Sequence, residues 1–177
     1  MSLRESLCGY AKQYPDDSQV IACITFLDAA VHPFDREHVE GHFTGSAWLV
    51  SADGERVLLT HHRKLNRWLQ LGGHADGDAD LARVALREAE EESGLTDLVV
   101  ENTIFDMDRH RIPARTNEPE HWHYDVRYVV RAMGSEAFVI SEESLALAWK
   151  PIRELANDPH ADESLRRMAC KWLARHP

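Results

Sequence analysis

The feature that most constrains the fold is one amphipathic helix, expected over residues 79–93 and bounded by glycines on both sides. With a turn of about 100° per residue, its apolar residues gather on one side: Leu81, Val84, Ala85 and Ala89. Gly94 supplies the expected helix stop. An apolar side of this kind must be buried, so the chain needs a sheet or further helices to cover it.

Strand-like segments flank this helix and supply that cover. Asp53-Gly54 is a strong hairpin signal between the expected strands 44–50 and 56–60. Trp68–Leu71 leads into Gly72-Gly73, directly before the helix. Further strands are expected at Leu98–Phe105, His121–Met133 and Ala137–Ile140, followed by a short helix at Ile152–Asn157 and a last helix at Asp162–Arg175. This order of elements predicts an α/β sandwich.

The first forty residues carry a different pattern. Leu3, Leu7 and Tyr10 recur at helical spacing, and 15–18 break the pattern and offer a cap for a second helix that ends near Leu27. We therefore expect an N-terminal helical extension over residues 1–40 and the main domain over residues 41–177. This extension could mediate a homodimer.

Composition limits the partners and the compartment. The net charge of the 177 residues is −10, which argues against a nucleic acid duplex, because phosphate contact needs a basic face. A small phosphorylated ligand is compatible with this charge if a divalent cation masks the repulsion. The sequence has no apolar run of about 20 residues and its three cysteines form no metal-binding pair, so we expect no membrane partner and a cytoplasmic location.

Glutamates on the expected helix are its chemically informative feature. Glu88, Glu91 and Glu92 are spaced i, i+3, i+4 and project from one edge of the apolar stripe, whereas Glu90 points away. Such converging like charges repel, and Mg²⁺ or Mn²⁺ would remove the conflict because these ions prefer oxygen ligands. Arg87 precedes Glu91 by four residues and can pair with it, orienting a carboxylate. A solvated acidic face is the alternative interpretation.

The same segment resembles the signature of the Nudix hydrolase family, G-x5-E-x7-R-E-U-x-E-E-x-G-U, where U is a bulky aliphatic residue. Gly73 opens the match, and Arg87-Glu88, Glu91-Glu92 and Gly94-Leu95 fall in register. The resemblance implies a Nudix-type α/β/α sandwich with a mixed sheet. It also implies that Glu88, Glu91 and Glu92 are the metal ligands and catalytic residues, that Arg87 orients them, and that Gly73 contributes a backbone carbonyl to the metal.

Two positions depart from this signature. Ala79 stands where the family has its first glutamate, and Ala89 is a small member of the aliphatic class. Asp78 or Asp80 could substitute for the missing carboxylate, although an offset of one residue turns a helical side chain through about 100°. Alternatively, either aspartate caps the helix or favours its positive end, and this is the interpretation we favour.

The expected strand 121–128 alternates strictly, with His121, His123, Asp125 and Arg127 on one face. This polar face could hold a transition metal, line a phosphate pocket, or simply face solvent. We favour pocket lining, with His123 and Arg127 binding substrate. His74, beside Gly73, is expected at the mouth of the metal site, and Arg63, within His61-His62-Arg63-Lys64, is expected to contact substrate phosphates.

Several further residues stay open on sequence grounds. Glu142 or Glu143 lies in a stretch that resembles the family's loop near the attacked phosphate, and either could be the general base; a helix cap at Ser141 explains them equally well. Three tryptophans could stack on a base, although aromatics in strands usually belong to the core: Trp48, Trp68 and Trp122.

The resemblance implies a metal-dependent hydrolase that cleaves the phosphoanhydride bond of a nucleoside diphosphate linked to another moiety, X. Attack by water would yield two phosphorylated products. The departure at Ala79 keeps a second hypothesis open, a catalytically impaired nucleotide-binding or regulatory module of the same fold. A diphosphate isomerase also belongs to the family, but no isomerase-specific feature is evident in the sequence.

Overall fold

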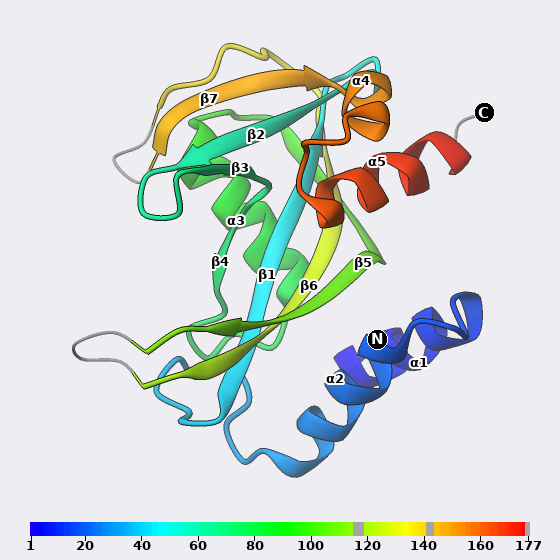
Figure 1. Cartoon of the computed structure of the whole chain (residues 1–177), viewed down its shortest axis with the longest axis vertical. Coiled ribbons are helices and arrows are strands. Elements are labelled where there is room, and N and C mark those ends of the chain that lie inside the picture. Colours follow the sequence, from blue (N-terminus) through cyan, green and yellow to red (C-terminus); the bar gives the residue numbers. More distant parts are fainter. Residues whose placement is uncertain (115–118, 141–143, 176–177) are drawn as a thin grey trace.

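The computed structural model describes residues 1–114, 119–140 and 144–175. The sheet follows the order β3-β2-β1-β6-β5, with β4 also paired to β1 and β7 to β2 (Figure 1). Its strands are β1 (Gly41–Val50), β2 (Arg56–His62), β3 (Arg67–Leu69), β4 (Leu71–His74), β5 (Leu98–Ile112), β6 (His121–Ala132) and β7 (Ser144–Pro151). Strands β1 and β6 are parallel and the other pairs are antiparallel. The expected mixed sheet is therefore confirmed.

Helices cover both faces of this sheet. The helix that carries the glutamates, α3 (Leu81–Ser93), packs on one face, and α4 (Ile152–Asn157) and α5 (Glu163–Arg175) contact each other on the other side (Figure 1). Alternate residues of β1 enter the two layers: Phe43 and Leu49 join the core under α3, while Trp48 and Val50 join the core under α5. The α/β/α sandwich expected from the sequence is confirmed.

The two N-terminal helices, α1 (Leu3–Gln13) and α2 (Ser18–Ala29), form as the periodicity predicts. They contact β5, and Leu7 and Cys23 are fully buried in the same core as the residues beneath α3. The Phe26 ring of α2 stacks on Tyr124 of β6 with centroids 4.2 Å apart. The helices therefore add apolar contacts to the sheet, and this burial stabilises the fold by about 25 cal/mol per Å² of apolar surface.

Helix α3 starts later than expected because Asp80 caps it. The Asp80 side chain accepts a hydrogen bond from the backbone N–H of Arg83 at 3.1 Å, so Leu81 is the first helical residue. At the other end Gly94 has φ 68°, a left-handed conformation that favours glycine, and its N–H donates to the Glu90 carbonyl. The predicted helix stop is confirmed, and Ala79 lies outside the helix.

Near residue 140 one predicted strand is absent and one observed strand was not predicted. Ala137–Ile140 does not form a strand, because Val139 donates its backbone N–H to the Ser93 carbonyl at the end of α3. The edge of β2 is instead paired with β7, a strand that the sequence analysis missed. Its residues, including Trp149 and Lys150, alternate only weakly between apolar and polar side chains, so the pattern carried little signal.

Candidate functional site

The glutamate side of α3 lies against β4, and two glycines of β4 make this approach possible. A Cβ at Gly73 would stand 2.5 Å from a carboxylate oxygen of Glu88, so any other residue at this position would force the Glu88 carboxylate to move. Gly72 donates its backbone N–H to the Glu92 carboxylate at 2.8 Å. The glycine pair before the helix thus fixes two of the three glutamates, both half-buried, whereas Glu91 is exposed.

The partner of Arg87 differs from the expected one. Its guanidinium donates to the Glu88 carboxylate at 2.8 Å and to the His74 carbonyl at 2.9 Å, so the predicted pairing with Glu91 was wrong. Glu91 is exposed and Glu88 faces β4, which places Glu88 where an arginine anchored on the His74 carbonyl can reach it. Arg87 therefore orients Glu88 and ties α3 to β4.

The position that breaks the family signature is exposed. Ala79 lies in the bend before α3, next to the capping residue Asp80. Asp78 forms an ion pair with Arg83 at 2.7 Å and accepts a hydrogen bond from the Asp80 backbone N–H. These contacts agree with the capping interpretation of both aspartates, since each is occupied at the N-terminus of α3.

The polar face of β6 is buried, so the solvent-facing alternative was wrong. Arg127, with 3% of its side chain exposed, pairs with Asp125 at 2.8 Å, Asp108 at 2.9 Å and Asp106 at 3.2 Å. Burial opposes the charge on Arg127, but the three carboxylates raise its pKa above the usual value. The expected role of Arg127 in binding substrate is therefore corrected: its guanidinium is already held by aspartates inside the sheet.

This buried network predicts a large effect on stability. Arg127→Met is expected to lower the free energy of unfolding by about 3–5 kcal/mol, because it leaves the buried Asp125 carboxylate without its counter-charge. Arg131→Met, on the same strand, is the control: Arg131 is half-exposed and its ion pair with Glu101 is worth at most about 1 kcal/mol. Urea denaturation measures both values. Equal, small losses would contradict the assigned role of Arg127.

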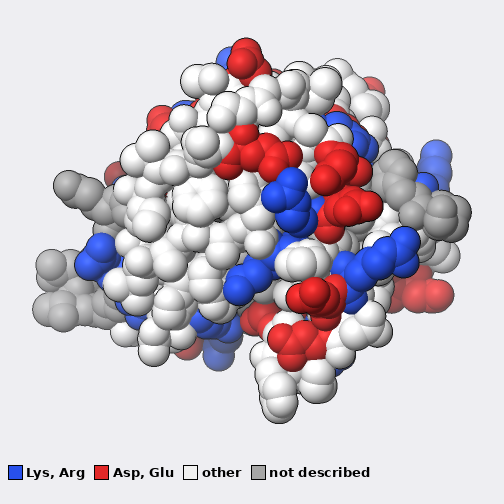
Figure 2. Space-filling view, turned by 90° about the horizontal axis from the view of Figure 1, so that it is seen from above, with Lys and Arg blue, Asp and Glu red and all other residues white. Residues whose placement is uncertain are grey.

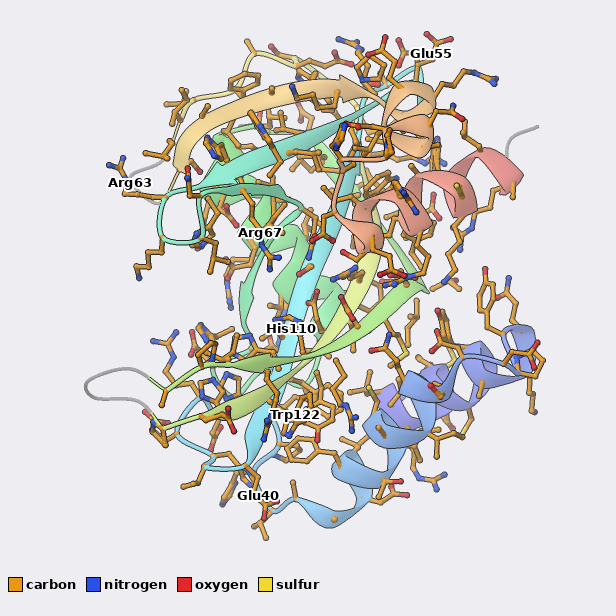
Figure 3. The ribbon with its side chains drawn as sticks, viewed as in Figure 1. Glu40, Glu55, Arg63, Arg67, His110 and Trp122 are labelled. Atoms are coloured by element: carbon orange, nitrogen blue, oxygen red, sulfur yellow. The ribbon has the colours of Figure 1, made fainter. Side chains whose placement is uncertain are left out.

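The remaining predicted substrate contacts lie in two places. His74 and His123 have ring centroids 5.3 Å apart, so the structure brings these two together. Arg63 lies at the β2–β3 turn, apart from Arg67 (Figure 3), and donates to the Ser144 carbonyl at 3.2 Å. Glu142 and Glu143 lie outside the described residues, although Ser144 opens a strand rather than a helix.

A cleft of about 570 Å³ opens between the β2–β3–β7 edge and the α4–α5 segment, with Leu59 and Leu165 among its apolar lining residues. Trp68 lies in its wall, stacked on His61 with centroids 5.2 Å apart, and Lys150 Nζ lies 4.7 Å from the Trp68 ring centroid. Arg67 projects from β3 toward α5 and pairs with Asp162 at 3.4 Å (Figure 3). This volume is in the range of small-molecule sites.

Of the three tryptophans considered for base stacking, only Trp68 lines this cleft. Trp48 is fully buried in the core under α5. Trp122 lies on the opposite side of the β5–β6 ribbon from His110 (Figure 3), where the guanidinium of Arg109 lies 4.4 Å from its ring centroid. Trp48 is therefore a core residue, and Trp122 packs against Arg109.

The sheet, its two helical layers and the glycine-bounded α3 with its glutamates define an α/β/α sandwich of the Nudix type. A family model described as the NUDIX domain matches residues 42–171. The chain therefore belongs to the NUDIX domain family.

Solved structures agree with this assignment. A hydrolase of the NUDIX family from Clostridium perfringens is 26% identical, with TM-score 0.60, and the match covers 77% of this chain and 98% of that one. An Ap4A hydrolase from C. elegans, solved as a binary complex, is 15% identical with TM-score 0.58, covering 75% and 96%. The MutT protein from Methanosarcina mazei Go1 is 17% identical with TM-score 0.58, covering 78% and 96%. The last two show the fold alone.

No curated protein gives a significant match to the chain. Among the described residues, no helix has both the length and the apolar character needed to cross a membrane. Seen from above, the molecule carries acidic and basic side chains side by side over one part of its surface and few charges over the rest (Figure 2). This face has no continuous basic patch among the described residues.

Proposed function

We propose that this chain is a metal-dependent hydrolase that cleaves a phosphoanhydride bond in a nucleoside diphosphate linked to another moiety, X. The observation that carries the proposal is the docking of Glu88 and Glu92 on the glycine pair of β4, within a signature that also contains Arg87 and Glu91. This arrangement holds carboxylates in fixed positions beside a sheet edge, which the folding of α3 alone does not require.

The residues present fit a hard divalent cation. Three glutamates offer carboxylate oxygens: Glu88, Glu91 and Glu92. Because Gly73 has no Cβ, the Glu88 carboxylate can lie directly against it. Mg²⁺ or Mn²⁺ takes such oxygen ligands, and the Gly73 carbonyl would complete the set. When bound, the ion supplies charge neutralisation at the diphosphate and lowers the pKa of a coordinated water.

The protein's own residues orient and separate the reacting parts. Arg87 holds Glu88, and the Gly72 amide holds Glu92. The cleft beside Trp68 would receive the base or X, since Trp68 offers an aromatic face and Lys150 a positive charge. Trp68 and Gly72 are four residues apart, at most about 14 Å. The cleft lies on the α5 side of the sheet and the glutamates on the α3 side, so an elongated ligand that joins them would have to pass around the strands between them.

Water attacks one phosphorus atom, the bridging oxygen leaves with the other phosphate, and the proton of the water passes to a base that we leave unassigned. Glu142 and Glu143 stay candidates for that base. His74 stays a candidate substrate contact, although its side chain lies on the opposite face of the sheet from the glutamates, and Arg63 would meet the substrate only at the far end of the β2–β3 turn. The partners we propose are small phosphorylated compounds, and the domain division at residue 41, the cytoplasmic location and the homodimer stay predictions.

The alternative function, a nucleotide-binding module without turnover, is motivated by Ala79. Ala79→Glu is expected to strengthen Mn²⁺ binding or leave it unchanged in an active enzyme, because position 79 is exposed and negative charge is favoured before a helix N-terminus. Mn²⁺ titration of both proteins, paired with turnover assays, measures this. A wild-type protein without turnover that gains it on Ala79→Glu would favour the module.

The experiment that tests the proposal is a screen of diphosphate compounds with Mg²⁺ and with Mn²⁺, read by product mass. Nucleoside triphosphates, nucleotide sugars, dinucleoside polyphosphates and coenzymes form its substrate classes. We expect one class to be split into two phosphorylated products. Tight binding of a compound without any product would favour the nucleotide-binding module over the hydrolase. A product of unchanged mass would indicate an isomerase.

A further inference from the structure

A cluster of histidines lies outside the glutamate site, on the opposite face of the sheet. His42 of β1 and His123 of β6 are direct partners in the parallel pair, and His74 of β4 lies beside them, because its strand pairs with β1 at Thr44. Position 73 of β4 faces α3, as its contact with Glu88 shows, so the neighbouring position 74 faces the other way. The histidines thus do not share a face with the glutamates.

The three rings are close enough to share one ion. The ring centroids of His42 lie 5.1 Å from His74 and 4.7 Å from His123. One ligand nitrogen from each of the three residues can be chosen so that all lie within 4.8 Å of one another. A tetrahedral Zn²⁺ with bonds of 2.0–2.1 Å holds its ligand atoms about 3.4 Å apart. Ring rotations that move each ligand nitrogen by about 1 Å would bring the three nitrogens to this spacing.

The burial of His42 is an independent observation that points to a ligand. Its side chain is fully buried, and within the described part of the chain neither of its ring nitrogens has a hydrogen-bond partner. A buried polar nitrogen without a partner is costly, and a bound cation satisfies it. Burial lowers the pKa of His42 and that of His123, in agreement with their enclosed positions.

Hydrogen bonds prepare His123 to act as a ligand. The Nδ1 of His121 lies 2.9 Å from the Pro119 carbonyl, which only accepts, so this nitrogen carries a proton. Its Nε2 lies 3.2 Å from the Nε2 of His123, where it is placed to accept a hydrogen bond from that ring. In this arrangement His123 is protonated on Nε2 and presents a lone pair on Nδ1. Metal-bound histidines commonly donate their second N–H in this way, which fixes the tautomer.

Arg36 opposes binding and provides a handle for testing it. Its guanidinium lies 2.6 Å from the Nδ1 of His74 and forms an ion pair with Asp76 at 3.1 Å. A cation would have to displace this guanidinium from His74 or share the space with its positive charge. The side chain is 52% exposed and keeps Asp76 as a partner when it withdraws.

We propose that His42, His74 and His123 form a second metal site, one that binds a transition-metal ion of the Zn²⁺ type. A donor set made only of imidazole nitrogens suits Zn²⁺, Co²⁺, Ni²⁺ or Cu²⁺ and not Mg²⁺, so it is chemically distinct from the glutamates of α3. Three protein ligands leave a fourth position for water or an exogenous ligand. The proposal is independent of the hydrolase function, because it uses none of its carboxylates.

The test is titration of the full chain, without a histidine tag, with Co²⁺ in excess Mg²⁺. We expect one equivalent to bind with the visible absorption bands of a nitrogen-coordinated ion, and Zn²⁺ to displace it. His123→Gln and the half-buried His74→Gln should each weaken binding about a hundredfold or more. His32→Gln, an exposed histidine outside the cluster, should leave it unchanged.

Two further variants separate the sites. Arg36→Met should tighten Co²⁺ binding because it removes the competing charge, and Glu92→Gln should leave Co²⁺ binding unchanged while it lowers hydrolysis. Circular dichroism and thermal unfolding confirm that each variant is folded. Binding that survives both His74→Gln and His123→Gln, that is lost in Glu92→Gln, or that is absent in the folded wild type would overturn the proposal.

Discussion

Removal of divalent cations is expected to abolish hydrolysis completely, and Mg²⁺ or Mn²⁺ alone is expected to restore it. The three carboxylates of α3 have like charge, and two of them are fixed against β4 by Gly73 and by the Gly72 amide. Without a cation they repel the diphosphate and leave the attacking water unactivated. Phosphate release is measured before chelation, in chelator, and after each ion is added back.

Restoration by Mg²⁺ without Zn²⁺ is an essential part of this prediction. It assigns the activity to the oxygen ligands of α3 rather than to the histidine cluster, since Mg²⁺ does not favour imidazole. Undiminished turnover in excess chelator would show that the glutamates act without a metal and would contradict the account.

The second large effect is expected at Glu92. Glu92→Gln keeps an oxygen that can accept the hydrogen bond from the Gly72 N–H but loses the negative charge, so the fold is retained and turnover falls about a hundredfold or more. Glu91→Gln is expected to cause a loss of the same order. Steady-state kinetics on the substrate found in the screen measures kcat and KM separately.

Glu90→Gln is the matched control for these variants. Glu90 lies on the same turn of α3 but is exposed and lies outside the signature's glutamates, so its turnover should stay close to wild type. Equal losses at positions 90, 91 and 92 would show that the charge of the helix as a whole matters, and would defeat the argument from geometry.

Local patterns predicted much of the fold. The apolar stripe predicted helix α3 and Gly94 predicted its end, and Asp53-Gly54 predicted the β1–β2 hairpin. These predictions succeeded because such signals depend only on neighbouring residues in the chain. Strand β7 was missed because its identity depends on pairing with β2, a distant segment. Residues 137–140 do not form a strand, although their composition favours one, because the Val139 N–H bonds to the Ser93 carbonyl at the end of α3.

The candidate site divides in the same way. The convergence of the α3 glutamates follows from their spacing on one helix, whereas the contacts of Glu88 with Gly73 and of Glu92 with the Gly72 N–H were not predicted. Arg127 was misassigned because its counter-charges come from Asp106 and Asp108 on β5, which alternation within β6 does not reveal. His42 was missed for a related reason: only the parallel pairing of β1 with β6 places it beside His123.

The most direct test of the central claim is hydrolysis in ¹⁸O-labelled water, with the mass of both products measured. A phosphoanhydride hydrolase breaks the P–O–P bridge by attack of water on phosphorus, so one ¹⁸O atom must appear in the phosphate of one product and none in the other. We predict that result for wild type with Mg²⁺, and its loss in Glu92→Gln. Unlabelled products, or a ligand bound and recovered intact with every class of diphosphate tested, would contradict the account.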